Sequence, residues 1–119
     1  MRWLLVALGG AVGAMARYGV GLAAERWPGL PLGTWAVNAL GCLLIGLALP
    51  LVKDDSARLA VLVGVLGSFT TFSTYSADTV VLWEAGRTGW AVANALGSVA
   101  VGAACVLAGL AAGRALAAG

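Results

Sequence analysis

Residues Gly64-Val-Leu-Gly-Ser-Phe-Thr-Thr-Phe-Ser-Thr-Tyr75 lie in the middle of a segment that is otherwise apolar enough to cross a membrane. Five serine and threonine hydroxyls stand here among the aromatic rings of Phe69, Phe72 and Tyr75, and two glycines precede them. Hydroxyls and a weakened helix are costly at bilayer depth unless they face protein or a polar cavity. The run therefore predicts a site or a pathway in the middle of the span.

The composition around this run excludes a soluble protein. Of the residues, 61% are hydrophobic and 10% are charged, whereas a soluble domain has about 25% charged residues. The net charge of +2, without a basic cluster, does not indicate a nucleic-acid partner. The chain has no histidine, and Cys42 and Cys105 both fall in apolar stretches. Buried free thiols are expected, and a transition-metal site is not.

Four apolar stretches are long enough to cross the bilayer, which predicts an all-α integral membrane protein with four transmembrane helices. The first begins near the N-terminus and is too long for a signal peptide, so we interpret it as a retained span. We expect one domain over residues 1–119, with spans at about 3–24, 32–52, 58–84 and 89–112.

The charges at the span ends give a weak orientation signal. An even number of spans places both termini on one side, together with four cations, whereas the other side has two. This difference slightly favours cytoplasmic termini and also allows insertion in both orientations. The four cations are Arg2, Lys53, Arg58 and Arg114, and the two are Arg26 and Arg87.

The third stretch is longer than a bilayer requires. A helix of about 27 residues exceeds the hydrocarbon core by roughly 10 Å. Glycine weakens a helix, and serine and threonine offer other partners to its backbone. A break near Gly67-Ser68-Phe69-Thr70 would absorb the excess length, and a tilted continuous helix is the alternative.

Polar residues in the other spans each allow two interpretations. Arg17 either extends to the interface or finds a partner at Asp78 or at the break, which would be a structural role. Asn38 is either a bond between helices or a donor that lines a path. Asn94 and Ser98, one turn apart, form a polar stripe that either joins helices or lines a water-accessible track.

Phe72 and Tyr75 share a helix face, being three residues apart. An aromatic ring has a positive edge, so the pair can receive a small anion without a formal charge. Plain packing is the alternative for both rings.

Together, these segments resemble the Fluc family of fluoride channels, also called CrcB proteins. The similarity covers nearly the whole chain. The first helix carries Gly9-Gly10-Ala11-Val12-Gly13-Ala14-Met15-Ala16-Arg17-Tyr18, and the second carries Gly33-Thr34-Trp35-Ala36-Val37-Asn38-Ala39-Leu40-Gly41. The third signature, Gly64 to Tyr75, is the most specific.

The resemblance implies a passive channel that exports fluoride across the cytoplasmic (inner) membrane and limits its toxicity, with no enzymatic activity. It implies an antiparallel, dual-topology dimer with two pores, each built from both subunits. A structural Na⁺ would lie at the dimer interface on the backbone carbonyls of Gly67 and Thr70. The implied fluoride path includes Asn38, Phe72, Tyr75, Thr71, Ser73 and Ser98.

The chain departs from the family at three positions. Tyr75 stands where the family usually has Phe, and Asn94 and Gly102 stand where many members have Tyr and Ser. Some family members are heterodimers of diverged chains, and a partner-dependent pore would tolerate an altered aromatic position. We expect a homodimer, with a heterodimer of related chains as the alternative.

Three rival functions fit the sequence less well. A small multidrug-type antiporter needs an embedded carboxylate in the first helix, where this chain has Arg17 and no acid before Glu25. A non-transporting assembly subunit explains the small-residue faces but not the Thr-Thr-Phe-Ser-Thr run. An intramembrane hydrolase would lack a histidine base for Ser73 or Ser98.

Overall fold

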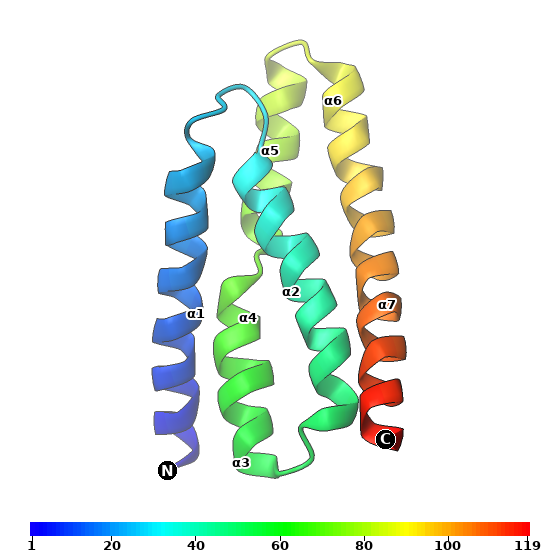
Figure 1. Cartoon of the computed structure of the whole chain (residues 1–119). Helices are drawn as coiled ribbons and strands as arrows, with labels where there is room; N and C mark the ends of the chain where they lie inside the picture. Colours follow the sequence, from blue (N-terminus) through cyan, green and yellow to red (C-terminus); the bar gives the residue numbers. More distant parts are fainter.

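The computed structural model describes all residues 1–119 and contains four long apolar helices arranged up and down (Figure 1). The spans are Arg2–Ala24, Leu32–Leu51, Asp55–Glu84 and Thr88–Ala118, so this is a multi-pass membrane protein. The elements are α1 (Arg2–Ala24), α2 (Leu32–Leu51), α3 (Asp55–Arg58), η1 (Leu59–Leu66), α4 (Gly67–Phe69), α5 (Phe72–Glu84), α6 (Thr88–Val92), η2 (Ala93–Gly97) and α7 (Ser98–Ala118), where η marks wide, π-type helix.

Both termini lie at one end of the bundle, as the even number of spans predicts (Figure 1). The α1–α2 and α5–α6 loops lie at the other end. Gly29 and Gly86 provide the positive φ angles of these loops, 99° and 74°, which glycine adopts without steric cost. The Arg87 guanidinium donates to the Gly29 carbonyl and so joins the two loops.

Close glycine contacts hold the spans in pairs. A Cβ at Gly9 or Gly13 of α1 would collide with backbone of the third span, at Ala60 and Val65 respectively. The same holds for α2 against α7, where a Cβ at Gly109 would meet the Leu43 carbonyl. In lipid, helices associate through such close packing of small residues.

The fourth helix runs beyond the limit of about residue 112 expected from the sequence and ends at Ala118. Glycine at position 113 predicts a helix end, but Gly113 is buried against Leu47 and Pro50 of α2. This contact keeps the backbone helical there, and alanine and leucine, both strong helix formers, continue it.

The third span is broken, and the alternative of a continuous helix is wrong. Thr70 (φ −84°, ψ 159°) and Thr71 (φ −150°, ψ 119°) are extended, whereas Gly67 (φ −62°, ψ −32°) is helical. The break therefore lies at the C-terminal edge of the predicted region. Before it, η1 and α4 pack against α1, and after it α5 packs against α6 (Figure 1).

Candidate functional site

The break at Thr70 and Thr71 deprives the carbonyls of residues 67–70 of their helical N–H partners, and the Ser68 carbonyl accepts from Arg17 instead. In a continuous helix, the Thr71 N–H would donate to Gly67, but here it donates to the Asn38 side chain. The Thr74 N–H, which would donate to Thr70, instead donates to Thr71 Oγ1, 3.2 Å away. The Gly67 and Thr70 carbonyls are thus left with acceptor capacity at membrane depth.

Asn38 of α2 holds the break by both ends of its amide. Its Nδ2 donates to the Thr71 carbonyl at 3.0 Å, and its Oδ1 accepts from the Thr71 N–H at 2.8 Å. This two-bond contact replaces the helical bonds that the extended backbone has lost. A primary amide has two N–H donors, so one donor of Asn38 is not used by Thr71.

Arg17 of α1 binds the break and not Asp78. Its Nε donates to the Ser68 carbonyl at 3.1 Å. Asp78 Oδ2 accepts from the Thr34 hydroxyl at 2.7 Å. Of the two partners expected for Arg17, Asp78 was therefore the wrong one, because α5 leaves the line of α4 after the break and places Asp78 beside α2.

Thr71 also caps α5. Its Oγ1 accepts from the Thr74 N–H and donates to Thr74 Oγ1 at 3.0 Å, and the Ser73 hydroxyl lies 3.3 Å away. An N-cap of this kind satisfies an N–H that the helix itself cannot pair. The cap restarts the helix directly after the break and fixes the direction of Phe72.

The aromatic pair stands on the first turn of α5. The rings of Phe72 and Tyr75 have centroids 5.5 Å apart at an angle of 41°. Phe72 is 79% exposed in the single chain, so it is not a core residue of the subunit. The Tyr75 hydroxyl donates to the Ala95 carbonyl in η2 at 2.6 Å, which fixes the second ring against the fourth span.

Asn94 is the buried centre of the polar stripe on the fourth span, with 1% of its surface exposed. Its Oδ1 accepts from Trp35 Nε1 at 2.5 Å and from Ser98 Oγ at 3.0 Å. Its Nδ2 donates to the Tyr75 carbonyl at 3.2 Å and to Thr79 Oγ1 at 2.7 Å. Asn94 therefore joins the second, third and fourth spans.

Sequence reasoning missed Trp35 and Thr79 as members of this network. The position of Trp35 near a span end indicates only an interfacial ring, although its N–H is an obligate donor that needs a partner when half-buried. Thr79 gives no signal, because a lone threonine in a helix also bonds back to its own backbone, as it does here to the Tyr75 carbonyl.

A groove of about 390 Å³ brings most of the predicted path residues together. It lies between α2, α5 and α7 and contains the extended backbone of the break. Its polar and aromatic lining comprises Asn38, Thr70, Thr71, Phe72, Tyr75 and Ser98, with Cys42 beside Gly102. Ser73 and Gly67 are exposed and do not line it.

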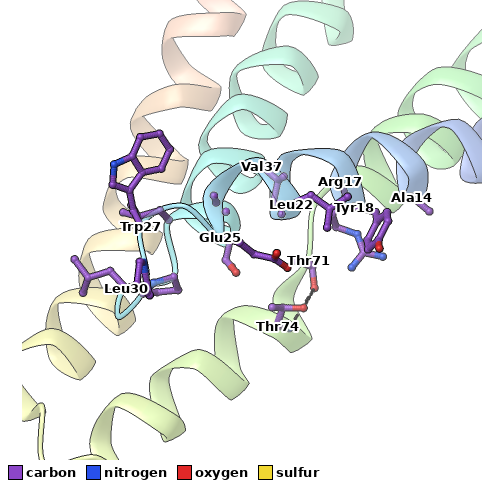
Figure 2. Close-up of a pocket in the computed structure, with 17 residues that line it drawn as sticks. Ala14, Arg17, Tyr18, Leu22, Glu25, Trp27, Leu30, Val37, Thr71 and Thr74 are labelled. Carbon is purple, nitrogen blue, oxygen red and sulfur yellow. Dashed lines mark hydrogen bonds between the residues drawn. The ribbon is translucent and has the colours of Figure 1, made fainter.

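A second cavity, of about 560 Å³, lies on the other side of the break. Figure 2 shows Arg17, Tyr18 and Glu25 of the first span and its end around this cavity, with Thr71 and Thr74 opposite. Thr71 lines both this cavity and the groove. Thr71 therefore stands between the two spaces.

Comparison with known proteins identifies the family. The family model for CrcB-like protein, Camphor Resistance (CrcB), matches residues 4–110. The chain belongs to the CrcB family. The match includes most of the first and fourth spans and the whole of the second and third, so the broken third helix lies within the part that matches the CrcB family.

Several curated relatives of this CrcB-family chain bear the name Fluoride-specific ion channel FluC. The protein of Paracoccus denitrificans (strain Pd 1222) is 50% identical over 118 residues, 96% of this chain and 95% of the relative. The Thermus thermophilus (strain ATCC 27634) protein is 48% identical over 107 residues, 85% of this chain and 86% of the relative. The Agrobacterium fabrum (strain C58) protein is 47% identical, with 92% of this chain and 94% of the relative covered.

Proposed function

We propose that this chain forms a fluoride-selective passive ion channel that exports fluoride across the cytoplasmic membrane and so limits its toxicity. The observation that carries the proposal is the groove at the break, in a chain whose relatives are named for fluoride channels at up to 50% identity. The groove contains no acidic or basic side chain, so its polar groups act on an anion through dipoles.

The chemistry of fluoride fits the groups around the break. Fluoride is small and strongly hydrated, so a path must replace its water with well-placed donors. The second N–H of Asn38 is such a donor, and the hydroxyls of Thr71 and Ser98 would become donors on turning away from Thr74 and Asn94, while Ser73 lies outside the groove. The positive ring edges of Phe72 and Tyr75 add attraction without a charge that would hold the ion.

A dimer completes the path in this proposal. The groove is open, and Phe72 is 79% exposed although it stands on its rim. A second copy packed against this face would enclose the groove and cover the ring. We propose an antiparallel homodimer with two pores, and a heterodimer of related chains would be detected as a partner of different mass.

The residues at the break also fit a structural Na⁺. The family resemblance implies that this ion would bind the Gly67 and Thr70 carbonyls, which are two of the carbonyls that lost their helical donors at the break. Na⁺ is a hard cation suited to oxygen ligands, and it would supply a fixed positive charge that holds the break in shape. Gly67 is exposed, which would allow both subunits to contribute these carbonyls.

Fluoride efflux tests the proposal directly. Purified protein is reconstituted into liposomes loaded with potassium fluoride or potassium chloride, and release is measured with ion-selective electrodes after addition of valinomycin. Fast fluoride release with chloride release near that of empty liposomes supports the channel. Equal release of both anions, or no release above empty liposomes, would refute it.

A further inference from the structure

The hydrogen bonds around Asn94 have a direction that chemistry fixes. The indole N–H of Trp35 can only donate, so the amide oxygen of Asn94 must face it, at 2.5 Å. The amide nitrogen then faces the Tyr75 carbonyl and the Thr79 hydroxyl, at 3.2 Å and 2.7 Å. No other orientation of this amide satisfies Trp35 and Tyr75 together.

This direction determines what Ser98 can do. Its Oγ lies 3.0 Å from Asn94 Oδ1, an atom that only accepts, so Ser98 must donate there. A serine has one O–H. Ser98 lines the groove beside Asn38 and also a neighbouring cavity of about 340 Å³ that Trp35 lines. In the resting network its only proton therefore points to Asn94 and not into these spaces.

We propose that Ser98 is a switchable donor for the passing anion, and that Asn94 and Trp35 are positioning residues that set how readily it switches. The inference rests on the proposed fluoride channel. When the Ser98 O–H rotates toward fluoride, Asn94 Oδ1 keeps the N–H of Trp35. No buried acceptor is left unpaired, so the rotation of the hydroxyl costs little free energy. The proton stays on Ser98 throughout.

The role of Trp35 follows from the same count of donors. If the indole N–H is removed, Ser98 becomes the only donor to a fully buried oxygen. Rotation toward the anion then leaves that oxygen unpaired, and the hydroxyl stays with Asn94. For Trp35→Phe we expect about a tenfold fall in fluoride flux, the scale set by one unpaired buried acceptor.

A double-mutant cycle tests the coupling. Fluoride efflux is measured for wild type, Trp35→Phe, Ser98→Ala and the double variant, with size-exclusion profiles to show that each remains assembled. In the Ser98→Ala background, Trp35→Phe should change flux less than twofold, because no hydroxyl remains to be held. Trp90→Phe is the matched control, since its ring lies 6.1 Å from that of Trp35 and is not part of the network. It should leave flux within twofold of wild type.

Other results would overturn the inference. If Trp35→Phe lowers flux by the same factor with and without Ser98, Trp35 acts only through packing. If Trp35→Phe leaves flux unchanged, Ser98 is not restrained by Asn94. Should Trp35→Phe not assemble, Trp35→benzothienylalanine keeps the indole shape without the N–H and gives the same readout. Absence of flux in wild type would refute the proposed function itself, whereas flux without coupling refutes only this inference.

Discussion

Phe72 offers the cleanest separation of folding from conduction at the scale of a single residue. Because 79% of its surface is exposed in the subunit, Phe72→Ile should change the stability of the subunit's own fold by less than about 0.5 kcal/mol, apart from any contact that the ring makes with a second subunit. The substitution removes a polarised ring edge, and fluoride flux should fall about tenfold or more. Liposome efflux and a thermal unfolding curve on the same preparation check both statements.

Tyr75→Phe is the control for Phe72→Ile, because it keeps the ring and removes the bond to the Ala95 carbonyl. We expect flux within a few-fold of wild type and a loss of about 1 kcal/mol of stability. If Phe72→Ile conducts normally, or if both variants lose flux equally, the ring edge is not the feature that matters.

Asn38 and Arg17 show how far residue-level prediction reached. From sequence, Asn38 has two alternatives, a bond between helices and a donor on a path, and the structure has Asn38 both bonded to Thr71 and lining the groove. A primary amide has two N–H donors, enough for a bond between helices and for a donor on a path. The residue type alone therefore could not decide between these two roles. The partner of Arg17 also depended on where the third span bends, which local sequence does not determine.

The break, at the scale of the element, depends on Arg17 as well as on Asn38. Arg17→Met keeps the apolar stem and removes the donor to the Ser68 carbonyl. A charged donor of this kind contributes about 1.5–3 kcal/mol, so we expect a lower unfolding midpoint and fewer dimers in detergent. The ratio of fluoride to chloride efflux of the assembled fraction should stay unchanged. A variant that assembles normally but loses selectivity would contradict this structural role.

Helix packing makes a second prediction at this scale, with a matched pair of glycines on α1. A Cβ at Gly13 would collide with the Val65 carbonyl, whereas a Cβ at Gly19 would have nothing within 4 Å. Gly13→Ala should destabilise the protein by about 1–3 kcal/mol through overpacking. Gly19→Ala should be neutral or stabilising by up to about 1 kcal/mol, the difference in helix propensity. Unfolding by denaturant in micelles measures both, and equal effects would contradict the close contact.

The elements could be predicted in kind but not in detail. Apolar length indicates four helices, because the bilayer fixes how many residues must cross it. The break is expected near residues 67–70, where the helix is intrinsically weak, and it lies at the C-terminal edge of that region, at Thr70 and Thr71. Tertiary partners decide this: the Asn38 amide and the Thr71 cap satisfy the extended backbone at that point only. The wide turns of η1 and η2 have no local sequence signal and were not predicted.

Basic residues are divided unevenly between the two ends of the molecule, but the difference in their number is small. Four cations lie at the end with the termini and two at the other, and Arg87 is bonded to the Gly29 carbonyl. Orientation follows the positive charges that flank the spans. A bias this weak fits a chain that inserts both ways, as an antiparallel dimer of one sequence requires.

Two double-lysine variants test this dual insertion. Ala117→Lys/Ala118→Lys adds charge at the end with the termini, and Glu84→Lys/Ala85→Lys adds it at the other end. Both pairs are exposed and lie at helix C-termini, where cations are favourable. Each variant should therefore fold and insert in one orientation.

When each variant is expressed alone, its fluoride efflux should fall more than about tenfold below that of wild type, because antiparallel partners are missing. Expressed together, they should recover efflux, since each supplies the orientation that the other lacks. Full efflux from one variant shown to have a single orientation would mean that the active dimer is parallel or that one chain conducts alone.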